Sequence, residues 1–513
     1  MRIFLNTLAT YGRSVIALLL GLFSTRWILR ALGADDFGLY GVVGSIIVFI
    51  TYLNTTLSGS ISRFYAYSIG QGLHKSERDR QNDLRHWFNI AVFIHTTLPL
   101  LLAVIGYPLG LYAINHWLVV PHDRIIACMW VFRFALVSAF VTMISVPYIA
   151  MFQARQLIME LSLVSIMQSI VNFVFEYKLL TVSCDRLVFY AFYMMATSVL
   201  LGLIQIVWAI TRFKECKIRF AEMIDAKRMN DFFSFAGAKL FGSTCVILRT
   251  QGGCVLLNRF FAPFVNAAYT ISVQVSAHTS SLSQSLIGAL QPAVVSKAGA
   301  NDLKGMIRYA ISSCRIASFL VMIFIVPLAA EINEVLRLWL GTPPQYAASF
   351  CVCALLMLLF DKMSIGYMLA ANAYGKKIIV YEVVLGLVLV FALPSAYVCF
   401  KFGCSPYYLS ICLAATMFCN AIARVLFCSW QLKMSFRTWI KSVFVPVALV
   451  SASAYALAVL IRNQIAPSVL RVSFVSMVSL LFVIIAGWFA IFTEAERSFV
   501  VSLAAKVTRK MRH

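Results

Sequence analysis

The sequence predicts an all-α integral membrane protein of about fourteen transmembrane helices: two six-helix lobes in a parallel, pseudo-twofold repeat, followed by two C-terminal helices. Hydrophobic residues make up 61% of the 513 residues and charged residues 12%, whereas soluble domains carry roughly 25% charged residues. The apolar residues also form runs long enough to cross a bilayer, separated by short basic segments. An echo between two halves of the chain predicts the repeat.

The apolar runs fall into three groups along the chain. The first six predicted spans cover residues 7–33, 37–62, 87–114, 124–152, 157–181 and 186–210. The next six cover 231–260, 264–290, 308–330, 346–372, 377–400 and 405–430, and the last two cover 441–462 and 468–492. The first run continues past Phe23 to Trp27 without a small-x-small cleavage site, so we interpret it as a membrane helix and not a signal peptide.

These groups define the predicted domains. Residues 1–210 form an N-terminal six-helix lobe, 231–430 a C-terminal six-helix lobe, and 431–513 two extra helices with a basic cytoplasmic tail. Between the lobes, in the linker 211–230, Phe220, Met223, Ile224 and Lys227 recur at helical spacing. This spacing predicts a short amphipathic helix on the inner membrane surface.

Lysines and arginines gather in alternate connecting segments. With the N-terminus inside, the cytoplasmic loops collect most of them, including Lys75, Arg155, Lys214 and Lys377. By the positive-inside rule, both termini face the cytoplasm and the number of spans is even. This topology accounts for the net charge of +23, so we expect no nucleic-acid partner.

The repeat rests on matched residues in the two halves. Tyr40 and Gly70 are separated by the same interval as Tyr269 and Gly299. Further on, Ser-Val-Pro-Tyr at 145–148 matches Ser-Ile-Gly-Tyr at 364–367. Because each unit has an even number of helices, both copies enter the membrane in the same direction, which favours a transporter with its substrate between the lobes.

The second helix of each half is unusually polar. In the eighth predicted span, one helix face carries Asn266, Thr270, Gln274, Ser281 and Gln284, and the corresponding part of the second span carries Asn54, Thr55 and Thr56. A polar stripe facing lipid would be costly, so it faces either a water-filled cavity or other helices. We predict cavity lining, because the stripe holds more polar groups than packing needs.

Charged residues within the spans are mostly cationic. The candidates for binding an anionic substrate are Arg249, Lys239, Arg133, Arg26, Arg63 and Arg315. A charge at mid-membrane costs at least roughly 2.5–3.5 kcal/mol unless it is paired or hydrated, although snorkelling to the headgroups is the alternative for Arg26 and for Arg424. Cations in a polar cavity call for an anion, and guanidinium binds phosphate or pyrophosphate bidentately.

Few acidic residues lie within the spans. Asp361 is the acid nearest mid-membrane, and Glu160 lies near a helix end; both are candidates for ion coupling. Lys362 adjoins Asp361, but neighbouring residues on a helix do not face each other. The 7 histidines form no ligand-spaced cluster and the 13 cysteines no Cys-x-x-Cys pair, so we expect no metal and no cofactor.

The residues that follow the first span resemble a known family. Leu-Gly-Ala-Asp-Asp-Phe-Gly-Leu-Tyr at 32–40, and Ser-Ile-Ser-Arg-Phe at 60–64, are similar to the bacterial polysaccharide flippases, the O-antigen and capsule exporters of the MATE-like MOP superfamily. The length and the six-six-two layout fit this family along the whole chain. The first span lacks the acidic residue of cation-binding multidrug antiporters, and the chain lacks the Ser-Arg-x-x-Gly-x-x-Arg-Asp opening of lipid II flippases.

The resemblance implies a cargo and a location. The cargo would be an oligosaccharide linked to undecaprenyl pyrophosphate, moved from the inner to the outer leaflet of the bacterial plasma membrane by alternating access. The lipid tail would stay in the bilayer while the head group crosses a cationic cavity between the lobes. We expect a monomer whose partners are membrane lipid, this cargo and other membrane proteins of polysaccharide assembly.

Two other classes of function stay open. A multidrug or small-solute exporter of the same superfamily would need acidic groups to bind cations, and only Asp361 lies at depth. A membrane enzyme of lipid-linked sugar assembly would need a catalytic surface outside the membrane. The outer loops are short and hold no paired Asp, Glu or His suited to acid–base chemistry, so we expect no enzymatic activity.

Overall fold

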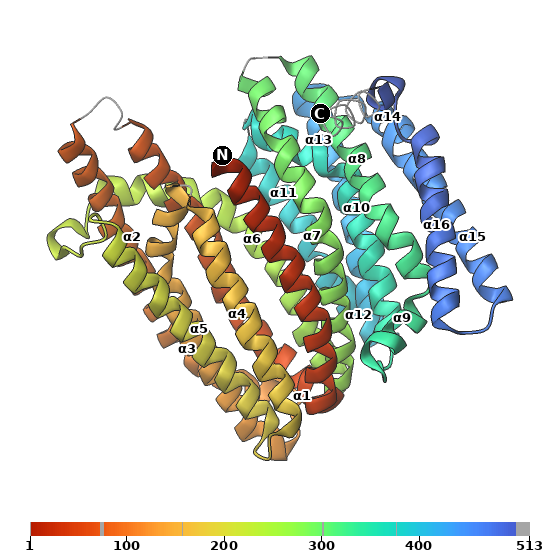
Figure 1. Ribbon diagram of the computed structural model, residues 1–513, viewed down its shortest axis with the longest axis horizontal. Coiled ribbons are helices and arrows are strands. Elements are labelled where there is room, and N and C mark those ends of the chain that lie inside the picture. Colours follow the sequence, from red (N-terminus) through yellow and green to blue (C-terminus); the bar gives the residue numbers. More distant parts are fainter. Residues whose placement is uncertain (1, 72–75, 156, 300–301, 376, 499–513) are drawn as a thin grey trace, which may run out of the picture. The chain divides into compact units, whose positions relative to one another are not determined.

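The computed structural model describes residues 2–71, 76–155, 157–299, 302–375 and 377–498, and within these ranges it is predominantly α-helical and contains no strand (Figure 1). Some side chains of the first, sixth and seventh helices lie outside the description. Eleven helices among the described residues are long and apolar enough to cross a membrane. The prediction of an all-α, multi-pass membrane protein is therefore confirmed.

The chain divides into two compact units, each described by itself. Unit 1 comprises Met1–Thr270, Trp339–Tyr346 and Leu393–Leu409, and unit 2 comprises Ile271–Leu338, Ala347–Ala392 and Ser410–His513. The helix α7 (Pro263–Gly299) begins in unit 1 and continues in unit 2. The six-helix lobes expected from the sequence stay a prediction.

Unit 1 is built mainly from the first half of the chain, residues 1–270. Its longer helices are α1 (Arg2–Gln71), α2 (Glu77–Tyr112), α3 (Ile125–Ala154), α4 (Ile158–Lys178), α5 (Arg186–Arg212) and α6 (Ala226–Phe260), with most of α12 (Ala392–Lys401) beside α6. Short turns η2 (Ala113–Trp117), η3 (His122–Arg124), η4 (Leu179–Thr181) and η5 (Phe220–Glu222) connect them. Helix α1 contacts α3, α4 and α6, and so lies at the centre of the unit.

Helix α1 contains the first two predicted spans, divided by one residue. Gly33 adopts φ 75° and ψ 174° in an otherwise helical segment. Glycine adopts positive φ readily because it has no Cβ. Five residues on, a Cβ placed on Gly38 would lie 2.0 Å from the carbonyl oxygen of Pro263, so this glycine permits the first turn of α7 to touch α1.

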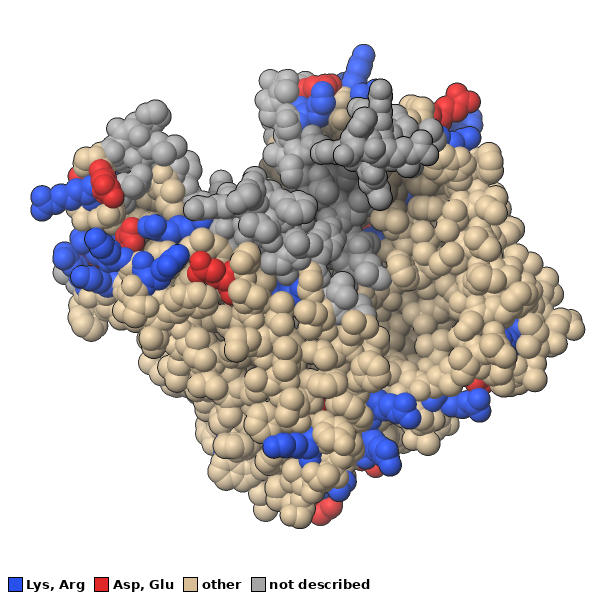
Figure 2. Space-filling model, in the orientation of Figure 1, with Lys and Arg blue, Asp and Glu red and all other residues tan. Residues whose placement is uncertain are grey.

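Apolar side chains from four helices pack together in unit 1. Tyr65, Phe88, Phe152 and Phe232, from α1, α2, α3 and α6, form the bulk of one buried cluster. On the face shown in Figure 2, charged side chains of unit 1 gather toward its ends, and the surface between them is mostly uncharged. This distribution fits a unit that crosses the membrane.

The predicted amphipathic helix in the linker 211–230 is wrong. Only the single turn η5 forms there, and α6 begins directly afterwards, with the Asp225 carboxylate accepting the backbone N–H groups of Lys227 and Arg228. Glu222 instead anchors the linker, because its carboxylate pairs with Arg85 of α2 at 2.9 Å. The apolar side chains that suggested a helix do not share one face. Met223 packs on the core of unit 1, whereas Ile224 is exposed.

Unit 2 contains the remaining helices. Besides the later part of α7, these are α8 (Leu303–Ala330), α9 (Ile332–Leu340), α10 (Ala347–Tyr374), α11 (Ile378–Val390), α13 (Tyr408–Leu432), α14 (Phe436–Trp439), η6 (Ile440–Phe444), α15 (Val445–Gln464) and α16 (Val469–Ala490). A Cβ on Gly366 would lie 1.7 Å from the carbonyl oxygen of Ala310, so α10 packs directly on the backbone of α8. Helices α15 and α16 form a hairpin that packs on α8 (Figure 1).

Candidate functional site

Arg249 lies within the membrane-spanning part of α6, in unit 1. Its side chain is buried, with 8% of the residue exposed. Polar groups of α6 and α7 surround this part of the unit: the Tyr269 hydroxyl donates to the carbonyl of Thr250, at 3.3 Å. A buried guanidinium in a membrane helix is the residue type that binds phosphate bidentately, so Arg249 stays the leading candidate for substrate binding.

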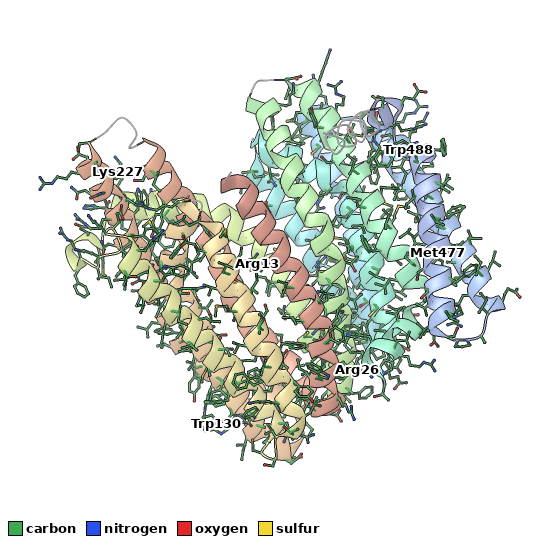
Figure 3. The ribbon with its side chains drawn as sticks, viewed as in Figure 1. Arg13, Arg26, Trp130, Lys227, Met477 and Trp488 are labelled. Carbon is green, nitrogen blue, oxygen red and sulfur yellow. The ribbon has the colours of Figure 1, made fainter. Side chains whose placement is uncertain are left out.

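The other predicted cations of unit 1 have different surroundings. Arg133 of α3 donates from Nε to the Tyr107 hydroxyl at 3.2 Å and lies 4.9 Å from the centre of the Trp130 ring. Arg26 is exposed and lies in α1 before the kink at Gly33 (Figure 3). The side chains of Arg63 and Lys239 lie outside the described residues.

Arg315, in unit 2, has an acidic partner that sequence reasoning missed. Its Nη2 lies 2.9 Å from Oε1 of Glu496, which follows the last span, and the Ser312 hydroxyl donates to the same oxygen. Burial acts to raise the pKa of Glu496, but Ser312, the backbone N–H of Thr493 and the charge of Arg315 outweigh it, so this pKa lies below its ordinary value of 4.5. Glu496 thus neutralises Arg315.

Asp361 also lies in a buried charge cluster of unit 2. Its Oδ1 accepts from Arg424 of α13 at 2.8 Å, and its Oδ2 accepts from Lys362 at 3.1 Å. The expectation that Lys362 would point away is wrong, because its long side chain bends back along α10. Arg424 is 8% exposed and also donates to the Ser364 hydroxyl, so the snorkelling alternative for Arg424 is wrong as well. Asp361 is therefore held between two cations.

Glu160, the second candidate for ion coupling, lies in the first turn of α4. One carboxylate oxygen is 3.7 Å from the guanidinium of Arg212, at the last residue of α5. The arginine is exposed, and the pair joins the start of α4 to the end of α5. Its geometry is that of a weak ion pair near a membrane surface.

The predicted polar stripe is described in part. Asn266 is fully buried, and its amide, oriented to suit its neighbours, donates to the carbonyl of Cys254 at 2.9 Å and accepts from the N–H of Asn258 at 3.3 Å. Thr270 packs against Gly41 of α1, where an added Cβ would lie 2.7 Å from the threonine hydroxyl. These two residues serve helix packing, and Gln274 is half-buried. Five predicted cavity residues lie outside the described side chains: Asn54, Thr55, Thr56, Ser281 and Gln284.

Residues of the 32–40 motif connect α1 to the starts of α3 and α5 in unit 1. Asp36 accepts two hydrogen bonds from Arg124, at 2.9 and 2.5 Å, and Arg124 also pairs with Asp185, the N-cap of α5, at 2.8 Å. Tyr40 packs against Tyr190 with ring centres 4.7 Å apart. The described side chains of this motif thus have structural roles.

A cavity of about 590 Å³ lies in unit 1, between α1, α6 and α12. Its lining is mainly apolar, with Gln251 and Arg259 as its larger polar members. Among the described side chains, no group of three or more His, Cys, Asp or Glu could hold a metal ion.

The fold and the apolar helices together define the class: an all-α, multi-pass membrane protein. No protein-family model matches the sequence, and no curated protein matches it. Several solved structures of membrane transporters do match it. The lipid II flippase MurJ, in an inward closed conformation, shares 13% identity with a TM-score of 0.69, over 94% of this chain and 98% of that one.

Two further structures give the same result. An inward-facing multidrug resistance MATE family transporter of the MOP superfamily shares 14% identity and a TM-score of 0.66, over 83% of this chain and 98% of the other. A MOP-superfamily transporter from Pyrococcus furiosus, described as having a binding pocket of reverse polarity, shares 13% identity and a TM-score of 0.60, over 84% and 95%. At these identities the likeness establishes that the chain has the fold of the MOP-superfamily transporters, and it leaves the substrate open.

Proposed function

We propose that the chain is a flippase that carries an oligosaccharide linked to undecaprenyl pyrophosphate from the inner to the outer leaflet of the bacterial inner membrane. The observation that carries the proposal is the charge of the buried side chains. Asp361, the acid predicted at mid-membrane, is paired with Lys362 and Arg424, and Arg249 is a buried cation in a membrane helix. Such an interior suits an anionic cargo better than a cationic drug.

Two further features support the same cargo. The motif at 32–40 resembles polysaccharide flippases, and the lipid II flippase fold matches 94% of the chain, against 83% for the MATE transporter. In this proposal the head group passes between two lobes that rock about the site, and both chain termini are cytoplasmic. Membrane lipid and other polysaccharide-assembly proteins are the partners, and the protein acts as a monomer without enzymatic activity.

An exporter of drugs or small solutes is the second candidate function. Its support is the likeness of the fold to a MATE family transporter. Such a protein would need a carboxylate available to a cation at depth, whereas Asp361 is held by two cations and Glu160 lies at a helix end beside Arg212. An enzyme of lipid-linked sugar assembly is the least supported alternative.

Arg249 gives the test of the proposed function. In a strain of the native host from which this gene is deleted, a plasmid copy should restore surface polysaccharide. Arg249→Ala should reach the membrane at the normal level yet restore at most about a tenth of the polysaccharide, because one charge-assisted contact is worth about 1.5–3 kcal/mol. Arg249→Lys should restore part, since the charge survives while bidentate geometry is lost.

The control separates binding from folding. Asn115→Ala changes an exposed polar side chain at the end of unit 1 and should leave both protein level and polysaccharide unchanged. Normal polysaccharide from Arg249→Ala would remove Arg249 from the mechanism and leave Lys239, Arg133, Arg26, Arg63 and Arg315 as candidates. Failure of the wild-type plasmid to restore polysaccharide would contradict the proposed function itself.

A further inference from the structure

A polar cavity of about 490 Å³ lies in unit 2, where the end of α8, the start of α9 and the turn between α15 and α16 meet. Figure 1 shows α9 near the end of the α15–α16 hairpin. The residues that give the cavity its chemistry are Glu331, Asn333, Glu334, Arg462, Asn463 and Arg471. The volume lies within the roughly 300–1,000 Å³ typical of small-molecule sites.

Two deeply buried charged groups of this cavity keep unused hydrogen-bonding capacity. Glu331 is 1% exposed; its Oε2 accepts from Arg471 at 2.9 Å, while its Oε1 has no hydrogen-bond partner among the described residues. Arg471 is 8% exposed, and its Nε likewise lacks a partner there. Buried polar atoms are nearly always hydrogen-bonded, so the Glu331–Arg471 pair leaves the wall of this cavity with an acceptor and a donor that a polar ligand can satisfy if the side chains turn toward it.

The remaining polar groups are equally mixed. Arg462 uses one N–H on the carbonyl of Ala330, at 2.8 Å, and Asn333 and Asn463 each contribute an amide that can donate and accept. The four charged lining residues, Glu331, Glu334, Arg462 and Arg471, cancel in charge. Two carboxylates oppose a phosphate and two guanidinium groups oppose a cation, so the cavity favours a neutral ligand rich in hydroxyl groups.

We propose that this cavity binds one sugar residue. A sugar hydroxyl can donate to a lining carboxylate such as that of Glu334 and accept from an N–H of Arg462 or Asn463, so neighbouring hydroxyls can engage both kinds of group at once. If both termini are cytoplasmic, α15 runs outward and the cavity opens on the outer face. This proposal rests on the proposed function and deepens it, because the cavity then holds one sugar of the transported oligosaccharide on the outer face.

The test measures binding, without transport. The probe is the host's own polysaccharide repeat unit, freed from its lipid carrier by mild acid and titrated against purified full-length protein in detergent by saturation-transfer NMR. We expect a dissociation constant of about 1 mM, corresponding to about −4 kcal/mol. Ala466→Trp, which fills the cavity from its exposed rim, should weaken binding at least about tenfold, and Asn463→Ala should weaken it about fivefold.

The matched control is Ala456→Trp, on an exposed face of α15 outside the cavity, which should bind like wild type. All variants should share the wild-type melting temperature, since none removes a side chain of the Glu331–Arg471 pair. Equal binding by wild type and Ala466→Trp would place the sugar elsewhere and overturn the proposal, as would no binding at all. Binding lost in Ala466→Trp supports the cavity even if the wild-type gene fails to restore surface polysaccharide, so the two proposals fail separately.

Discussion

At the scale of single residues, the Asp361 carboxylate is one anion held by two cations within a membrane-spanning helix. Lys362 is 1% exposed and Arg424 is 8% exposed, so neither can reach water by a small movement. Removing one partner of a buried ion pair leaves the other uncompensated. The three side chains therefore do not contribute equally to stability.

Removing the acid should cost more than removing either cation. Asp361→Asn leaves two buried cations side by side and should destabilise the protein by about 3–5 kcal/mol. Arg424→Leu leaves the Asp361–Lys362 pair intact and should cost less. Thermal unfolding of the purified protein in detergent measures both; a higher melting temperature for Asp361→Asn than for Arg424→Leu would contradict this assignment of charges.

The sequence predicted the burial of the candidate residues better than their ion-pair partners, because the partners lie far away in the chain. The burial of Arg249 followed from its place in an apolar run. The partner of Arg315, Glu496, is separated from it by 181 residues and lies beyond the last span, and the partner of Asp361, Arg424, is on another helix. Periodicity along one segment carries no information on such distant contacts. Lys362 was misjudged for a different reason, because helix-face geometry ignores the reach of a long side chain.

At the scale of elements, almost every predicted span coincides with a helix, because apolar runs of this length have few alternatives in a membrane. Segments outside the apolar runs were predicted less well. The linker was expected to be helical from four apolar or basic residues, yet its conformation is set by the Glu222–Arg85 pair and by the Asp225 cap. The short helix α9 was not foreseen, because its amphipathic nine residues directly follow a span.

The segment after α16 is fixed to α8 by Glu496, which makes its docking sensitive to pH. Because the pKa of Glu496 is lower in the folded protein than its ordinary 4.5, its carboxylate stabilises the docked segment at pH values above about 4.5. This stabilisation should be lost progressively as the pH falls below that value. After correction for the pH dependence of intrinsic exchange, the backbone N–H groups of residues 492–498 in wild type should be less protected from hydrogen exchange at pH 4 than at pH 6.

Glu496→Gln supplies the comparison, since it cannot ionise. Once intrinsic exchange rates are corrected for pH, this variant should show the same degree of protection at both pH values, below that of wild type at pH 6. A segment whose protection in wild type is unchanged down to pH 3 would show that Glu496 does not anchor it. Trp488 lies near the C-terminal end of α16 (Figure 3) and packs near Phe492. Its fluorescence therefore gives a second measurement on the same segment.

For the whole molecule, the sequence predicted the all-α membrane fold, and the MOP-superfamily structures match it at 13–14% identity. Fold survives at such identity because hydrophobic length and helix packing constrain it, whereas substrate choice depends on a few side chains. The order of the matched pairs Tyr40/Tyr269 and Tyr148/Tyr367 predicts that the two halves superpose by rotation about the membrane normal. That repeat stays a prediction.

The orientation of the molecule can be tested directly. The excess of Lys and Arg in alternate loops predicts that the turn between α15 and α16 lies outside and that the segment before α14 lies inside. Alkaline phosphatase, which is active only outside the inner membrane, should be active when fused after Pro467 and inactive when fused after Lys433. The opposite pattern would place the polar cavity of unit 2 on the cytoplasmic side.

The central claim is that the protein moves a pyrophosphate-linked oligosaccharide across the bilayer, and lipid vesicles containing the purified protein test it most directly. The measured quantity is the fraction of carrier-linked oligosaccharide that a membrane-impermeant oxidant, periodate, can reach. Vesicles with wild-type protein should expose nearly all of it, whereas empty vesicles and vesicles with Arg249→Ala should keep about half protected, because only the outer leaflet is accessible. If the wild-type vesicles also keep half protected, yet move a fluorescent organic cation, the account is contradicted and the protein is a cation exporter.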